Sequence, residues 1–177
     1  MEEDTKKSIY KFMVTVDEYK SGKIFEYMKQ IDVAVKLLDI PLIKNTVRRK
    51  LTGKLAKQHG DFILASQENL DCIINSARTI AVGPRMCYHL YKKDLSYAIF
   101  LDELAVALIQ TGYAKEISKE DAIFVMKEGK ESGRLQLISK VSGKPLELCN
   151  QSLKTCSLWK LKRAGFKIFG NPPDGQD

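Results

Sequence analysis

The sequence contains no long apolar run, and this absence excludes a membrane-spanning segment. Its longest run of apolar residues is six residues, Leu104 to Ile109, whereas a transmembrane helix needs about 20. The first four residues, Met1 to Asp4, lack the positive start and apolar stretch of a secretory signal. We therefore expect a protein that is not secreted, that lies in the cytoplasm or the nucleus and that has no membrane partner.

Histidine and closely spaced cysteine are also scarce, and this argues against a metal centre. The chain has two histidines and four cysteines, and no two cysteines stand at the short spacing of structural zinc sites. Cys87 and His89, which a strand would project to one face, are the best pair for metal binding or nucleophilic catalysis. In a protein that is not secreted, we expect the cysteines to remain thiols.

Catalytic motifs are absent as well. No phosphate-binding glycine loop, dinucleotide fingerprint or nucleophile elbow occurs. The carboxylates in or beside the expected strands form no recognised metal-binding set, although Mg²⁺ and Ca²⁺ would require converging oxygen ligands. The sequence therefore predicts no catalytic residues, no metal and no cofactor.

The chain does have a sizeable apolar fraction and an excess of positive charge. Its 177 residues are 44% apolar, and 29 Lys and Arg residues against 22 Asp and Glu residues give a formal charge of +7. This length suits one domain, with or without a tail. The positive excess suits a polyanionic partner, although a surface charged only for solubility gives the same total.

The order of apolar patterns predicts an α+β domain. Strand-like patterns cover six segments, at residues 9–16, 24–27, 33–37, 79–82, 86–91 and 97–101. Helix-like patterns cover residues 45–60, 66–77, 102–112, 118 onward and 148–169. The simplest architecture for this order is a small antiparallel barrel or sheet with helices.

A basic stretch is the strongest local signal for function. Val47, Leu51 and Leu55 recur every four residues, which predicts a helix with one narrow apolar stripe. Around the stripe lie six cations without an intervening acid: Lys44, Arg48, Arg49, Lys50, Lys54 and Lys57. Each Lys or Arg near a phosphate releases counterions, so this cluster favours salt-sensitive binding of nucleic acid. A solvated helix face without a partner is the alternative.

A second mixed segment lies near the C-terminus. Four cations flank three aromatic residues there: Lys160, Lys162, Arg163 and Lys167 around Trp159, Phe166 and Phe169. Aromatic rings interleaved with cations suit the stacking of single-stranded bases. The apolar residues of the segment equally suit docking on the rest of the fold, or on a protein partner or a second copy: Leu153, Leu158, Trp159, Leu161 and Phe166.

Three local matches and the order of elements resemble the staphylococcal nuclease-like family, which has an OB-type barrel with helices. Residues 35–41, Val-Lys-Leu-Leu-Asp-Ile-Pro, resemble the family's V-R-L-x-x-I-D-x-P-E. Residues 104–114 resemble its V-N-x-x-L-V-x-x-G-x-A helix, which also follows a strand. Residues 120–138 resemble its terminal helix and final apolar element. The resemblance covers residues 9 to 140 and implies a small antiparallel OB-like β-barrel with three to five helices.

The departures from this family remove its catalytic site. The catalytic arginine is replaced by Lys36, the metal-binding aspartate has no counterpart because Ile40 abuts Pro41, and the glutamate after the proline is Leu42. Asp39 stands one residue early and would point to the other face of a strand. The resemblance thus implies a degenerate, non-catalytic member, as in Tudor-type RNA-silencing proteins, where such barrels bind RNA or support protein contacts.

The resulting expectation has three parts along the chain. Residues 1–8 form a flexible N-terminus, residues 9–140 form the nuclease-like domain with a basic helical insertion near 44–60, and residues 141–177 form a C-terminal helical extension. Lys36 joins the basic cluster in binding nucleic acid, RNA rather than DNA, mainly through phosphates. The rival expectation is a protein-interaction scaffold or adaptor, which uses the C-terminal extension to bind a partner or to form a homodimer.

Overall fold

The computed structural model describes residues 16–19, 21–38, 40–55, 62–85, 87–88, 97–141 and 143–170. Within these ranges the elements follow one another as α2 (Lys23–Leu37), α3 (Pro41–Leu55), β1 (Phe62–Leu64), α4 (Gln67–Ser76), β2 (Ile80–Pro84), β3 (Tyr97–Leu101), α6 (Asp102–Gln110), β4 (Lys115–Glu116), α7 (Lys119–Glu131), β5 (Leu135–Val141), β6 (Lys144–Gln151) and α8 (Ser157–Arg163). None of the helices in these ranges is long and apolar enough to cross a membrane.

The strands form one antiparallel sheet that stays open. Its order is β1-β5-β6-β3-β2-β4, so the short strands β1 and β4 lie at its two edges. The hairpin of β5 and β6 lies next to β1, and β6 pairs with β3 at the centre of the sheet. The α+β class and the antiparallel sheet are therefore as predicted, whereas the described strands do not close into the expected barrel. The described residues also form more helices than the three to five expected.

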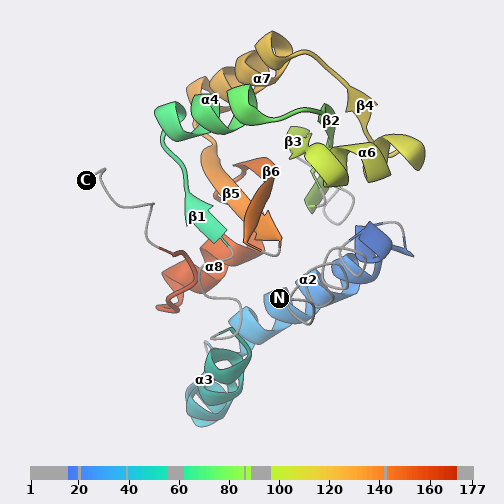
Figure 1. The fold of residues 1–177 in the computed structure, drawn as a ribbon. Helices are drawn as coiled ribbons and strands as arrows, with labels where there is room; N and C mark the ends of the chain where they lie inside the picture. Colours follow the sequence, from blue (N-terminus) through green and yellow to red (C-terminus); the bar gives the residue numbers. More distant parts are fainter. Residues whose placement is uncertain are drawn as a thin grey trace.

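Alternating side chains give the sheet two apolar faces. On β3, Ile99 and Leu101 join one core cluster, while Ala98 and Phe100 join another. The first cluster is covered by α4 and α7, which pack side by side above the sheet in Figure 1. The second is covered by α6 and by Tyr19, with Trp159 of α8 at its margin. A sheet covered on both faces matches the apolar character of β3.

A third core cluster lies outside the sheet and joins three helices. Ile31 and Leu38 of the α2 segment, Leu161 of α8 and Phe166 are buried together, and Val47 of α3 packs against them half-buried. In Figure 1 α2 runs below the sheet and α3 projects from its end at the bottom of the molecule. We call α2, α3 and residues 157–170 the helical unit.

The strands predicted at 24–27 and 33–37 are wrong, because both segments belong to α2. The alternation of Val33, Val35 and Leu37 suggested a strand, yet Val33 is 56% exposed. The residues that meet the core are Ile31, Val35 and Leu38, which stand three to four residues apart as on one face of a helix. The motif at 35–41 that resembled a nuclease strand thus spans the end of α2 and the start of α3.

The helix predicted over 148–169 is also largely wrong. Residues 144–151 form β6, and α8 covers only Ser157–Arg163. The start of the predicted C-terminal extension includes the turn of the β5–β6 hairpin, in which Gly143 has a φ of +81°. The predicted domain boundary at 140/141 therefore falls inside this hairpin. Pairing with β3 and β5 overrides the local helical pattern.

Other elements agree with their sequence patterns. Strand 97–101 and the helices at 66–77, 102–112 and from 118 correspond to β3, α4, α6 and α7. Ser66 and Ser118 cap α4 and α7 by accepting backbone N–H bonds, as expected for helix starts. Most of the strands predicted at 9–16 and 86–91 lies outside the described residues, and Cys87 and Tyr88 are helical.

Candidate nucleic-acid interface

The basic stretch predicted as a helix is α3, and it begins earlier than predicted. Pro41 occupies its first turn, where the missing N–H costs no hydrogen bond, and the carbonyl of Ile40 accepts from the backbone of Lys44 at 3.0 Å. Val47 and Leu51 are half-buried, as the apolar stripe predicted. All the remaining side chains of α3 from residue 41 to residue 50 are exposed.

Arg48 connects α3 to the C-terminal segment. Its guanidinium lies 5.8 Å from the centroid of the Phe166 ring, within cation–π range. Phe166 reaches this position because α8 ends in a Schellman turn, in which the N–H of Gly165 donates to Lys162 and the N–H of Phe166 donates to Leu161. Gly165 has a φ of +88°, and an added Cβ would lie 3.2 Å from the guanidinium of Arg48.

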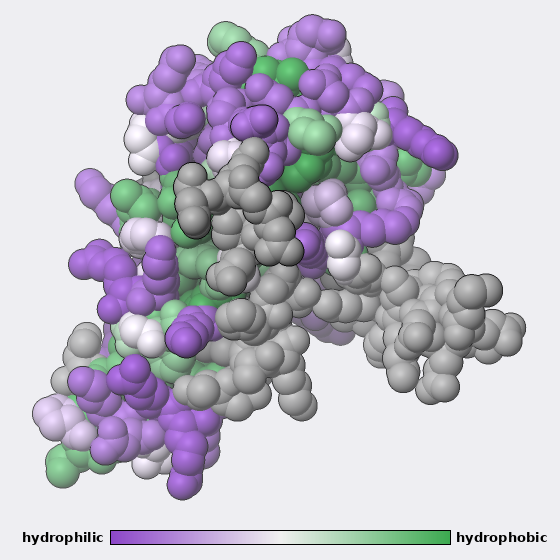
Figure 2. All heavy atoms as spheres, turned by 60° about the vertical axis from the view of Figure 1, so that its left-hand side comes forward, coloured by the Kyte–Doolittle hydropathy of each residue, from purple (hydrophilic) through white to green (hydrophobic). Residues whose placement is uncertain are grey.

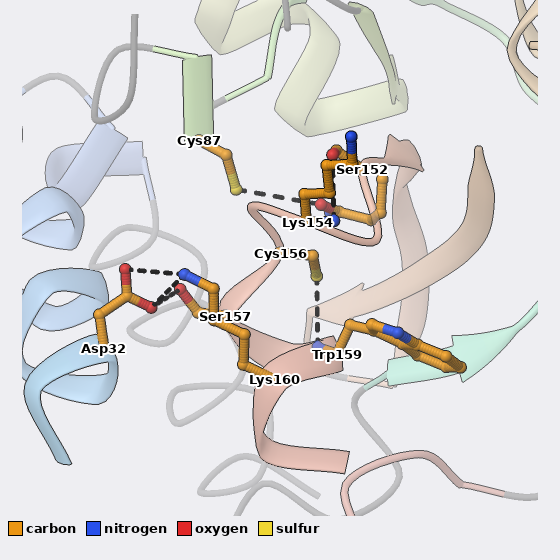
Figure 3. A network of polar contacts seen from close by, with 9 residues as sticks. Asp32, Cys87, Ser152, Lys154, Cys156, Ser157, Trp159 and Lys160 are labelled. Atoms are coloured by element: carbon orange, nitrogen blue, oxygen red, sulfur yellow. Dashed lines mark hydrogen bonds and ion pairs between the residues drawn. The ribbon is translucent and has the colours of Figure 1, made fainter. Parts of the chain in front are cut away.

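Asp32 holds α8 against α2. Its carboxylate accepts from the hydroxyl of Ser157 at 3.1 Å and from the ammonium of Lys160 at 3.1 and 3.2 Å (Figure 3). These side chains are mostly enclosed, since Lys160 and Asp32 retain 28% and 16% of their exposure. A paired charge in a partly buried site contributes more than an exposed pair. The contact fixes α8 beside α2 although the residues are 128 positions apart.

The helical unit concentrates the positive charge of the protein. Residues 23–37, 41–55 and 157–170 carry twelve Lys and Arg residues and only two acids, Glu26 and Asp32. The remainder of the chain carries seventeen basic and twenty acidic residues. The excess of +7 therefore originates entirely in this unit. In Figure 2 hydrophilic residues cover the lower part of the molecule, where α3 lies in Figure 1, and also its upper part.

Five predicted nucleic-acid-binding cations belong to the surface of this unit. The structure places Lys36 on the last turn of α2, and Lys44, Arg48, Arg49 and Lys50 on α3, all exposed. Lys54 belongs to α3 by its backbone, whereas Lys57 lies outside the described residues. The exposed Lys162, Arg163 and Lys167 extend the same positive character on the C-terminal segment.

The predicted protein-interaction residues belong mainly to the chain's own core. Leu161 is fully buried and Phe166 retains 7% exposure in the third core cluster. Leu158 and Trp159 are half-buried and pack on the second cluster. Leu153 alone of the five is exposed, at 43%. The docking of this segment on the rest of the fold, which the sequence left open, is what the structure shows.

Trp159 and Phe169 form an aromatic pair beside the basic residues. Their ring centroids lie 6.4 Å apart with an interplanar angle of 36°. The ammonium of Lys162 lies 4.6 Å from the Trp159 centroid and 5.5 Å from that of Phe169. The backbone of Trp159 is fixed by its N–H, which donates to the Sγ of Cys156 at 3.4 Å (Figure 3).

The sequence reasoning missed an exposed apolar corner between α2 and α3. Leu42 is 94% exposed, Ile40 44% and Ile43 37%. Together with Val33 they make up half of the large apolar side chains that are exposed in the described part of the chain. Ile40-Pro-Leu-Ile43 is an apolar run next to a helix start, which is the signal that marks it in the sequence.

A buried polar group of residues lies on the α6 side of the sheet. The Tyr19 hydroxyl donates to Glu147 at 2.5 Å, and Gln151 accepts from the guanidinium of buried Arg85 at 3.1 Å. The amide of Gln151 also donates to the Sγ of Cys149 at 2.7 Å. Burial raises the pKa of Glu147 and raises the pKa of Tyr19 well above its usual value, with the charge of Glu147 adding to the shift of Tyr19.

The thiols of this group are protonated at neutral pH. Burial raises the pKa of Cys87 to about 12 and also raises the pKa values of Cys149 and Cys156. A neutral thiol is a poor nucleophile and a poor metal ligand. All four cysteines are free, with Cys72 exposed, and His89 lies outside the described residues. Within the described ranges no three His, Cys, Asp or Glu residues are arranged to hold a metal ion.

An open groove runs beside the start of α6. Arg78, Asp102, Glu103 and Lys144 are among the residues that line it. Its polar groups bind one another: the Asp102 carboxylate accepts the backbone N–H of Arg78 at 2.8 Å, and Lys144 donates to Glu103 at 2.8 Å. The groove therefore presents charges of both signs rather than a concentration of one sign.

Comparison of the chain with protein-family models, with curated proteins and with solved structures found no match.

Proposed function

We propose that this protein is a binding module for nucleic acid, single-stranded or RNA rather than duplex DNA, that acts through the helical unit. The observation that carries the proposal is the separation of charge, because the unit holds twelve cations and two acids while the rest of the chain is slightly acidic. A cluster of this density displaces the counterions condensed on a phosphate backbone.

The contacts within the unit favour a fixed surface over a loosely charged tail. The α3 helix is tied to Phe166 through Arg48, and α8 is tied to α2 through Asp32. Fixed cations lose less side-chain and backbone freedom on binding than a disordered basic segment does. The surface carries guanidinium groups at Arg48, Arg49 and Arg163, which suit bidentate contacts with phosphate oxygens.

Fluorescence anisotropy of labelled single-stranded RNA and duplex DNA over a salt series tests this proposal. We expect log K to fall linearly with log salt, with a slope that corresponds to neutralising on the order of four or more phosphates. The double substitution R48E/R49E should weaken binding and flatten this slope. The matched control is K127E/K130E on α7, which covers the opposite side of the sheet from α3 (Figure 1).

Two results would count against the proposal. Absence of binding at low salt would reduce the charge to a solubility feature. Equal losses in R48E/R49E and K127E/K130E would show that net charge matters and that the position of the helical unit does not.

A second candidate function, a protein-interaction module, is favoured by the apolar corner rather than by the C-terminal extension. The corner presents Ile40, Leu42 and Ile43 to solvent beside Lys44, whereas Leu161 and Phe166 are buried. Three side chains are too few for a standard interface, which buries about 800 Å² on each partner. The corner would therefore act as an anchor within a larger contact.

A further inference from the structure

We infer that the pair of Trp159 and Phe169 is a stacking site for unpaired bases, which makes single-stranded nucleic acid the ligand of the helical unit. This inference rests on the proposed function, because it adds a base contact to the phosphate contacts of the same unit. The ligand class is defined by one property, which is that its bases are unpaired and their flat faces are free to stack.

The first argument is the position of the two rings. Trp159 lies on a different face of α8 from the buried Leu161, and Figure 3 shows its indole ring turned away from Asp32 and Cys87. Both Trp159 and Phe169 are half-buried and pack against the second core cluster, so each is held by the core without being fully enclosed. Their backbones and rings are thereby fixed before a ligand binds.

The second argument is what covers the rings. The Lys162 ammonium lies 4.6 Å and 5.5 Å from the two ring centroids, and the Lys162 side chain is exposed. A cation–π contact at an exposed site is weaker than the stacking of a base on an aromatic ring. A base can therefore displace Lys162 from the rings, and the released ammonium can bind the adjacent phosphate.

The third argument is the charge around the pair. Arg163 and Lys167 are exposed on the same segment, and no acidic residue occurs between residues 157 and 170. The phosphates of a strand whose bases stack on the rings would therefore lie beside cations of this segment and beside none of its carboxylates. A duplex, whose bases are already stacked and paired, would gain only the phosphate contacts.

Trp159 is the sole tryptophan of the chain, and its fluorescence gives a direct readout of the site. The experiment titrates the full chain with a short uridine oligomer, with a duplex RNA of equal charge and with heparin, a polyanion without bases. Excitation at the red edge avoids the tyrosines, and anisotropy of labelled ligands reports binding in parallel. We expect all three to bind at low salt, and only the uridine oligomer to quench Trp159 strongly.

The substitution W159A tests the contribution of the ring to affinity. It should weaken binding of the uridine oligomer by roughly five- to 150-fold, the equivalent of one stacked base, and leave heparin affinity within about twofold, since the phosphate-binding cations remain. The circular dichroism spectrum reports whether the variant is folded. W159F keeps an aromatic ring and should retain most of the affinity.

The outcomes separate this inference from the proposed function. Binding of the oligomer without selective quenching, or equal quenching by heparin, would overturn the stacking site and leave the phosphate surface standing. If no ligand binds, both proposals fail. If W159A loses affinity for both the oligomer and heparin, the quenching of Trp159 in the unmodified chain decides the question. Selective quenching by the oligomer supports the stacking site, and its absence overturns it.

Discussion

The guanidinium of Arg48 lies 5.8 Å above the ring of Phe166, and this contact joins the two basic segments of the chain. One segment is α3 and the other follows α8, so the cations of the two segments belong to one connected surface. The joint depends on Gly165, whose positive φ turns the chain after α8 and whose missing Cβ leaves space for Arg48. Its energetic contribution is open to direct test.

Substitution G165A should lower the free energy of unfolding by more than the strain of its backbone alone. An alanine at a positive φ costs roughly 1–2 kcal/mol, and its Cβ would also press on the guanidinium of Arg48. Gly133 is the matched control, with a φ of +71° and nothing within 4 Å of an added Cβ. Urea denaturation of G165A and G133A compares the two, and equal losses would contradict a structural contact with Arg48.

Substitution G129A should be among the most destabilising single changes in α7. An added Cβ would lie 2.2–2.4 Å from the side-chain atoms of Asn150, and overpacking a core of this kind costs about 3 kcal/mol. Asn150 cannot move freely, because its amide donates to Val125 at 3.1 Å and its oxygen accepts from Gln136 at 3.2 Å.

The double variant G129A/N150A checks the cause of that loss. Removing the Asn150 side chain relieves the collision, so the double variant should be more stable than the sum of the single losses predicts. Chemical denaturation of the four chains measures this coupling. Strict additivity would show that Gly129 is required for a reason other than Asn150.

The buried carboxyl group of Glu147 should make stability depend on pH in a defined direction. Its folded-state pKa is raised above the usual value by burial, so its stabilising protonation is complete below the unfolded pKa and is lost as pH rises through the folded pKa. E147Q is uncharged throughout and keeps an acceptor for Tyr19. Relative to the unmodified chain, E147Q should therefore gain stability as pH rises from acidic to neutral values.

Glu103 provides the control of opposite sign for that experiment. Its hydrogen bond with Lys144 lowers the pKa of the Glu103 carboxyl, so its contribution is present above the unfolded pKa and lost as pH falls. E103Q should accordingly lose stability relative to the unmodified chain as pH rises. Equal pH profiles for E147Q and E103Q would contradict the buried environment of Glu147.

Thiol labelling should distinguish Cys72 from the other cysteines. Cys72 is exposed on α4, whereas Cys87, Cys149 and Cys156 are buried with raised pKa values. We expect one fast thiol per native chain with an aromatic disulfide reagent, and four after denaturation. C72S should abolish the fast phase, and a remaining fast thiol would contradict the packing of the α6 side of the sheet.

The apolar corner predicts a change in association without a change in stability. Leu42 is 94% exposed, so L42K should alter the free energy of unfolding by no more than about 0.5 kcal/mol. If the corner anchors a protein partner, L42K should abolish that association and leave nucleic-acid binding intact or slightly stronger. The matched change is F124K on α7, another exposed apolar residue.

Local signals in the sequence were sufficient for some elements and insufficient for others. The helix-like apolar patterns located α4, α6 and α7, and the strand-like run at 97–101 located β3. The α2 helix was missed because three residues in alternation suggested a strand, although Ile31, Val35 and Leu38 face the core. The β6 strand was missed because its pairing partners lie far away in the chain.

The candidate site shows the same division. The cations of α3 were identified from their number and from the absence of acids, both of which are properties of the sequence. Their proximity to Phe166 and the position of Lys162 over Trp159 depend on the Schellman turn after α8 and on the Asp32 contact. No pattern in either segment indicates the other, because tertiary contacts between distant segments set their positions.

The distance of 128 positions between Asp32 and Lys160 has a consequence for thermal stability. A surface assembled from both ends of the described chain exists only in the folded state, so a ligand that requires that surface binds the native form more tightly than the unfolded one. Mass action then raises the melting temperature as ligand concentration increases. A peptide that copies α3 alone would not reproduce the effect, since an isolated helix of this length is marginal in water.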